Sequence, residues 1–171
     1  FNDARVRTAL KLGLDRDIIV NKVKAQGEDP AYSFTPPFTD GMKLDKPEWM
    51  SWTQEKRNEE AKKLLAEAGY TADKPLTFDL LYNTSDLHKK LAIAAASIWK
   101  KNLGVNVKLQ NQEWKTFLDT RHQGNFDVAR AAWCADYNEP TSFLNILQSD
   151  SSNNTSHYKS AAFDQVLKSA L

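Results

Sequence analysis

Residues 76–109, LTFDLLYNTSDLHKKLAIAAASIWKKNLGVNVKL, decide the fold because two strand patterns there flank one helix pattern. In residues 76–82 apolar side chains alternate with polar ones, which predicts a strand. Residues 83–85, Asn-Thr-Ser, offer side-chain oxygens that can cap a helix, and residues 86–102 follow with helical apolar spacing. A second alternating run, residues 105–109, predicts another strand. The order strand, helix, strand indicates a right-handed crossover and therefore an α/β fold.

The alternation of helices and strands continues on both sides of this unit. The first expected helix is capped by Asp3 and has the apolar face Val6, Ala9, Leu10 and Leu14. Further helices are expected over 18–23, over 54–68, from Trp114 to Gly124 and from Pro140 onward. A third strand is expected over 126–133. The predicted fold class is α/β, with a small mixed or parallel sheet flanked by helices.

Two stretches lack periodicity. Residues 28–51 mix prolines with aromatic side chains, which predicts an ordered loop that wraps the core rather than a flexible linker. Residues 149–156, SDSSNNTS, predict a polar surface loop.

The bulk composition excludes several classes of protein. A chain of 171 residues can bury one core, so one domain over 1–171 is expected. Its net charge of +1 and the lack of a basic patch interleaved with aromatics exclude nucleic acid as a partner. The apolar run 91–96 is too short to cross a bilayer. A single cysteine cannot form an internal disulfide.

The candidate binding site follows the third predicted strand. Residues 130–142, RAAWCADYNEPTS, place Asp136 where a strand hands over to a helix, and α/β proteins usually bind ligands at such junctions. Aromatic neighbours would lower the local dielectric, so a charged Asp136 would need a cationic partner, which we take to be the ligand. The structural alternative is that Asp136 only caps the following helix.

Enzymatic and cofactor chemistry find little support. Cys134 could form a thiol–imidazole pair with His88, His122 or His157. However, it lies at a strand end with no oxyanion-hole glycine turn nearby, which favours a buried, inert thiol. The histidines lack metal-ligand spacing and the glycines are dispersed, so we expect no metal, no cofactor and no catalysis.

Two motifs resemble signatures of one known family. Residues 133–140, WCADYNEP, and residues 1–7, FNDARVR, continuing to LDR at 14–16, are similar to those of bacterial oligopeptide-binding proteins. These are extracytoplasmic receptors of peptide ABC importers, in extracellular solute-binding family 5. The resemblance covers essentially the whole chain and implies a type II periplasmic-binding-protein-like lobe. It also implies the binding of short peptides by what all peptides share, namely an α-ammonium, a backbone and a terminal carboxylate.

The resemblance implies roles for the residues near the third strand. Asp136 would hold the ligand α-amino group, and Cys134 would pair with the ligand through its main chain. Ala132 stands where relatives carry glycine, so its methyl group would narrow the groove slightly. Trp133 would form a wall of the cleft, with core packing as the alternative, and Trp114 is a weaker lining candidate.

A second set would meet the rest of the ligand. Arg130 and Arg121 would meet a carboxylate or hold a buried network. Asn83 and His88 would line the cleft, with His88 facing the end of a longer ligand. Lys24 would also contact ligand, unless it is only a cation at a helix C-terminus.

The resemblance also implies partners. Both chain ends look cut, so we expect a fragment that is mainly one lobe of a two-lobed, periplasmic receptor whose second lobe is missing, and which is monomeric. Closure of the two lobes on a peptide would let the receptor dock on ABC importer permease subunits. The alternatives are a receptor of the same family for dipeptides, murein peptides, haem or nickel chelates, and, from another class, a cysteine hydrolase using Cys134. Asp136 favours a ligand with a free amine.

Overall fold

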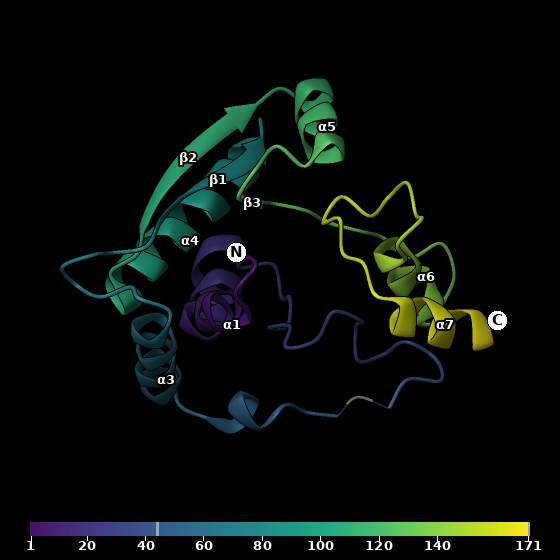
Figure 1. The fold of residues 1–171 in the computed structure, drawn as a ribbon, viewed down its shortest axis with the longest axis horizontal. Coiled ribbons are helices and arrows are strands. Elements are labelled where there is room, and N and C mark those ends of the chain that lie inside the picture. Colours follow the sequence, from purple (N-terminus) through teal and green to yellow (C-terminus); the bar gives the residue numbers. More distant parts are fainter. Residues whose placement is uncertain (44, 171) are drawn as a thin grey trace.

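The central strand β1 (Thr77–Asn83) pairs in parallel with β2 (Asn106–Gln112) on one side and with β3 (Val128–Ala129) on the other (Figure 1). The register places Thr77 opposite Asn106 and Leu80 opposite Val128. The computed structural model describes residues 1–43 and 45–170. The predicted α/β class is confirmed, and the sheet is parallel.

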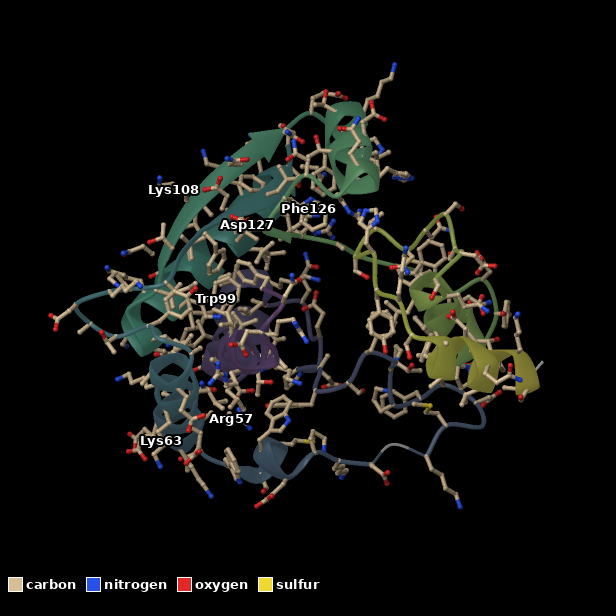
Figure 2. All side chains as sticks on the ribbon, viewed as in Figure 1. Arg57, Lys63, Trp99, Lys108, Phe126 and Asp127 are labelled. Atoms are coloured by element: carbon tan, nitrogen blue, oxygen red, sulfur yellow. The ribbon has the colours of Figure 1, made fainter. Side chains whose placement is uncertain are left out.

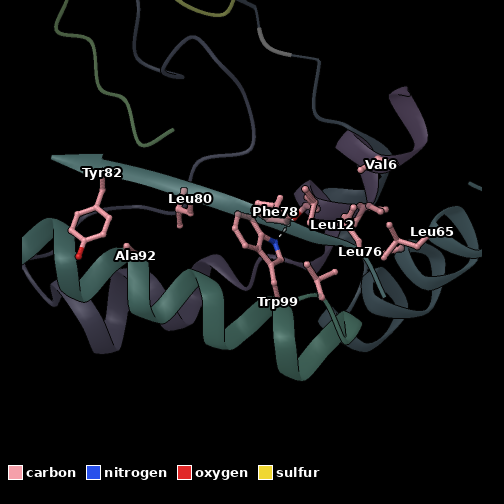
Figure 3. Close-up of a cluster of buried hydrophobic side chains, with 13 residues drawn as sticks. Val6, Leu12, Leu65, Leu76, Phe78, Leu80, Tyr82, Ala92 and Trp99 are labelled. Atoms are coloured by element: carbon pink, nitrogen blue, oxygen red, sulfur yellow. Dashed lines mark hydrogen bonds between the residues drawn. The ribbon is translucent and has the colours of Figure 1, made fainter. Parts of the chain in front are cut away.

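Helix α4 (Asp86–Leu103) makes the crossover between β1 and β2 and packs on the sheet. As expected, the Ser85 hydroxyl caps its first turn, and Gly104 ends it with a φ of 70°. Its buried face carries Trp99, whose ring meets that of Phe78 at 5.6 Å between centroids and whose indole N–H donates to the Leu10 oxygen (Figure 3). Sheet and helices therefore share one core.

Two further helices complete this core. Helix α1 (Ala4–Gly13) buries the predicted stripe that includes Val6 and Leu10 against α3 (Gln54–Glu67). The end of α1 approaches α4 so closely that a Cβ on Gly13 would lie 2.4 Å from the Leu103 side chain, so any larger residue there would displace Leu103.

After α1 the chain continues as α2 (Arg16–Ile18) and the π-helical turn η1 (Ile19–Lys24). It then enters the loop predicted over 28–51, here called the aromatic loop. This loop runs beneath α7 (Ala161–Ser169) and returns to α3 through a 3-10 turn, η2 (Glu48–Ser51) (Figure 1). Its ring pair, Tyr32 and Trp49, packs at 5.4 Å between centroids.

Arg57 fixes the returning end of the loop to α3. It is 6% exposed and donates to the oxygens of Trp49 and Met50 and to the Gln54 side chain. Figure 2 shows Arg57 on the inner side of α3 and Lys63 on its outer side. Arg57 is buried although it is charged, because the aromatic loop folds over it.

The remaining helices lie to one side of the core. After β2 comes α5 (Trp114–Gln123), and after β3 come α6 (Thr141–Leu144), the turn η3 (Asn145–Leu147) and α7 (Ala161–Ser169). Figure 1 shows α6 and α7 apart from α1, α3 and α4. The buried cluster draws its residues from positions 6–128, so the assignment of 1–171 to a single lobe stays a prediction.

The third strand is shorter than the predicted 126–133. Only Val128 and Ala129 pair with β1, and the Arg130 N–H makes one more bond, of 2.8 Å, to the Leu81 oxygen. Beyond this point the chain turns toward α6, where Ser142 binds both Trp133 and the Asp136 N–H. These tertiary bonds compete with continued sheet pairing, which periodicity alone does not reveal.

Candidate functional site

The carboxyl ends of β1 and β3 bring three predicted site residues to one edge of the sheet. Asn83 ends β1 and is 7% exposed, while Arg130 directly follows β3. His88 stands in the first turn of α4, and its Nδ1 lies 2.9 Å from Oδ1 of Asn83. Neighbouring parallel strands end at the same edge, which is where α/β sheets bind ligands.

Positive charge gathers at this edge without a neutralising carboxylate. Burial lowers the pKa of Arg121 and of Arg130, and the charge of Arg121 lowers that of Arg130 further. The ion pairs within residues 1–43 and 45–170 leave out both arginines. Burial and then the charge of Arg130 lower the pKa of His88, so its imidazole is neutral at neutral pH. Half-buried cations that have no carboxylate partner among the described residues favour an anionic group at this place.

Thr155 was missed by sequence reasoning and supports Arg121 directly. The Nη2 of Arg121 donates a 3.0 Å hydrogen bond to Oγ1 of Thr155. The two residues are 34 positions apart, and the polar loop that carries Thr155 gives no sequence signal for this contact. Only the tertiary fold brings them together.

Residues 131–135 present an open main chain next to these cations. They are extended and exposed, and within the described part of the chain their main-chain N–H and C=O groups make no hydrogen bond. Ser142 holds the segment at its middle and just beyond its C-terminal end, because it accepts from the Trp133 indole at 2.7 Å and from the Asp136 N–H at 2.9 Å. Unpaired, extended main chain of this kind can take up another strand.

An apolar groove of about 530 Å³ lies beside this segment. Its walls come from the aromatic loop, α5, residues 131–133, α6 with η3, and the loop after η3: Phe34, Pro36, Trp114, Leu118, Arg121, His122, Ala131, Ala132, Trp133, Phe143, Ile146, Leu147, Asn153, Thr155 and Ser156. Four predicted residues, Trp114, Arg121, Ala132 and Trp133, thus line one groove. Trp133 is 39% exposed, which agrees with a wall rather than a core residue.

Asp136 offers a free carboxylate beyond the far end of the segment. It is exposed, does not line the groove and, among residues that the structure describes, has no ion-pair or hydrogen-bond partner for its side chain. The alternative role as a helix cap is wrong, because Oε2 of Glu139 accepts from the Thr141 N–H at 3.0 Å at the start of α6. The carboxylate is thus available to a cation from outside.

Two further predicted residues, Cys134 and Lys24, lie outside the groove lining. Cys134 is exposed, so the expectation of a buried thiol is wrong; the strand that would have buried it ends at Ala129. Lys24 lies in the last turn of η1 and forms a 2.6 Å ion pair with Glu28, away from the groove lining. That pair suits the alternative of a helix C-terminal cation.

No group of three or more His, Cys, Asp or Glu side chains among the described residues could hold a metal ion. None of the helices is long and apolar enough to span a bilayer, over the same residues.

Comparisons with known proteins identify the family of this chain. Residues 1–155 match the family model described as bacterial extracellular solute-binding proteins, family 5 Middle. The periplasmic oligopeptide-binding protein OppA of Salmonella typhimurium is 82% identical over 171 residues, which are 100% of this chain and 32% of the relative.

Two solved structures share the fold. Haemophilus influenzae OppA in complex with the peptide RPPGFSPFR superposes with a TM-score of 0.95 at 48% identity, covering 99% of this chain and 34% of that one. The Escherichia coli murein tripeptide-binding protein MppA superposes with a TM-score of 0.94 at 53% identity, covering 99% and 33%. The chain therefore spans about a third of the length of these relatives.

Proposed function

The chain belongs to the bacterial extracellular solute-binding proteins of family 5, and from this membership we propose that it is the ligand-binding part of a periplasmic receptor for short oligopeptides. The receptor delivers its peptide to the permease of an ABC importer and performs no chemistry on it. The remaining two thirds of the protein supply the second lobe, and the receptor works as a monomer. The single observation that carries this proposal is the open main chain of residues 131–135, with a free carboxylate at one end and unpaired cations near the other.

The peptide α-ammonium binds Asp136. This carboxylate has no competing cation among the described residues, and its position is held by the bond from its own N–H to Ser142. A charge-assisted hydrogen bond becomes strong when the closing lobe shields it from water.

The peptide backbone pairs with residues 131–135, including Ala132 and Cys134. Each peptide bond of any sequence offers the same donor and acceptor, so this pairing accepts many peptides. The Trp133 indole is already bound to Ser142, which leaves the main chain of the segment as the free hydrogen-bonding surface.

The peptide carboxylate meets the cations at the sheet edge. Arg130 and Arg121 supply the charge, and His88 with Asn83 lines the approach for longer ligands. Lys24 would first have to release Glu28, so it contributes only to ligands long enough to reach it.

Side chains of the peptide enter the apolar groove. Trp133 and Trp114 form walls, and no acidic side chain lines it. Closure of the two lobes around the ligand removes the groove from water and creates the form that docks on the permease.

Calorimetry of the full-length receptor tests the proposal. A tripeptide is compared with its N-acetylated form, which keeps every other group but lacks the ammonium. We expect tight binding of the free tripeptide and a loss of affinity on the order of a hundredfold or more for the acetylated one, as for removal of one partner of a buried charge pair. Equal affinities would remove the role of Asp136. A murein tripeptide measured in the same series tests the alternative of a murein-peptide receptor. Such a receptor would bind the murein tripeptide more tightly than ordinary tripeptides.

A further inference from the structure

The loop between η3 and α7, residues 148–160, is folded around the side-chain amide of Asn154. Asn154 is only 8% exposed. Its Nδ2 donates to the oxygens of Gln148, at 2.9 Å, and Tyr158, at 2.8 Å, while its Oδ1 accepts from the Ser156 hydroxyl at 2.8 Å. Both amide protons and the amide oxygen are thus used, so the side chain fixes the path of the loop on both sides of itself.

The loop is also held from outside at two points. At its beginning, the Ser149 N–H donates to Oδ1 of Asp164 on α7 at 3.0 Å. Hydrogen bonds from the side chain and then from the main chain of Ser149 lower the pKa of this carboxyl group. Near its end, His157 adopts a φ of 56° and lays its ring on Gly124, where a Cβ would lie 2.7 Å from Nε2. The loop therefore rests against the C-terminal end of α5.

This packing brings the loop to the cationic edge of the site. Thr155 is the residue after Asn154, and its hydroxyl accepts a 3.0 Å hydrogen bond from Nη2 of Arg121. Thr155 also lines the groove, together with Asn153 and Ser156. Within the described part of the chain, Thr155 is the one side chain that hydrogen-bonds Arg121. The orientation of the guanidinium depends on where the loop holds this hydroxyl.

We propose that Asn154 is a positioning residue for carboxylate recognition: it acts through Thr155 to hold Arg121 ready for the terminal carboxylate of the ligand. This inference rests on the proposed function, because that function identifies the anion bound by Arg121 as the terminal carboxylate of a peptide. Asn154 itself faces its own loop and does not line the groove. A buried amide that orders a loop fixes the loop before ligand arrives, so that less ordering remains to be done on binding.

The test uses the full-length receptor and one tripeptide in two forms, with a free C-terminal carboxylate and with a C-terminal amide. Calorimetry gives the affinity ratio between the two forms for wild type, Asn154→Ala, Thr155→Val and the double variant. Asn125→Ala is the matched control, since this exposed asparagine stands near the same end of α5 and its side chain makes no hydrogen bond within the described residues. Hydrogen exchange of residues 148–158 without ligand reports on the loop independently of peptide binding.

We expect each single variant to lower the carboxylate-to-amide affinity ratio on the order of tenfold, the size of one hydrogen bond to a charged group. The double variant should lower it no further than Thr155→Val, because both act through one bond. Exchange of the loop should rise in Asn154→Ala and stay unchanged in Asn125→Ala. Equal weakening of both peptide forms, an additive double variant or unchanged exchange would each overturn the inference. If wild type binds neither peptide, the proposed function fails and this role fails with it, whatever the exchange data show of the loop.

Discussion

The indole Nε1 of Trp133 donates a 2.7 Å hydrogen bond to the main-chain oxygen of Ser142. The Ser142 hydroxyl also accepts from the Asp136 N–H, so one residue of α6 holds the exposed segment at both Trp133 and Asp136. Rigid presentation of residues 131–135 depends on these two bonds, because the segment has left the sheet.

Replacing Trp133 by Phe keeps an aromatic wall but removes the indole donor. We expect a loss of about 1 kcal/mol in the free energy of unfolding, the usual net value of one hydrogen bond. Denaturant unfolding with an unchanged m-value measures it. Trp114→Phe is the control: Trp114 is 51% exposed, and its indole N–H makes no hydrogen bond within residues 1–43 and 45–170, so its loss should be smaller. Equal losses in both variants would contradict the anchoring role.

Arg130→Gln should raise the pKa of His88 only part of the way to its ordinary value. The larger cause of the shift, burial of the imidazole, remains, while the repulsion from Arg130 disappears. Titration of the His88 ring protons by NMR measures this. Lys90→Gln removes the same charge from an exposed position of α4 and should leave the pKa unchanged.

The same shift gives the protein a pH dependence with a definite sign. The folded state lowers the pKa of His88, so it disfavours the charged imidazole. The resulting contribution to stability is fully present above the unfolded pKa of about 6.5 and is lost as the pH falls through the lower folded value. His88→Gln should flatten this part of the stability profile, and a steeper profile in that variant would refute the assignment.

Asp136→Asn in the full-length receptor should weaken peptide binding on the order of 2–5 kcal/mol, because the ligand ammonium loses its partner inside a closed site. Asp150→Asn, in the exposed turn after η3, makes the same charge change and should leave affinity unaltered. Calorimetry at one salt concentration compares the two. Similar losses would point to long-range electrostatics instead of a direct bond.

Arg57→Met should lower the free energy of unfolding by about 2 kcal/mol, since the part-buried oxygens of Trp49 and Met50 lose their donor. Lys63→Met, on the exposed face of the same helix, should change it by less than about 0.5 kcal/mol. Thermal unfolding of both variants decides the matter. A tolerated Arg57→Met would mean that the aromatic loop is held by its rings alone.

Cys134→Ser should bind peptide as wild type does, because in the proposed binding mode only the main chain of this residue pairs with the ligand. The exposed thiol of the wild type should react readily with an alkylating reagent, and bound peptide should slow that reaction. A cysteine hydrolase would instead lose all function in the Ser variant.

Local sequence signals predicted the elements that local interactions decide. Asp3, Thr53 and Ser85 cap their helices as expected, and Gly104 and Gly124 end theirs in the left-handed region. Each of these assignments needs only a few neighbouring residues.

The misassignments share a different cause, which is contact between residues that no helical or strand periodicity connects. Residues 130–133 look like strand but exchange sheet pairing for the bonds to Ser142. Arg57 looks solvated until the aromatic loop covers it, and Thr155 lies in a polar loop until α5 brings Arg121 to it. No periodicity within a window can report such pairings.

The free main chain of residues 131–135 also limits how the proposed receptor can select among peptide sequences. Successive side chains of an extended strand point to opposite sides. A peptide paired with this segment would point only every second side chain toward the apolar groove lined by Trp133. The other side chains would face the second lobe of the proposed receptor. Any preference exerted by this region must therefore repeat with a two-residue period, and a position-by-position peptide library would display it as an alternation.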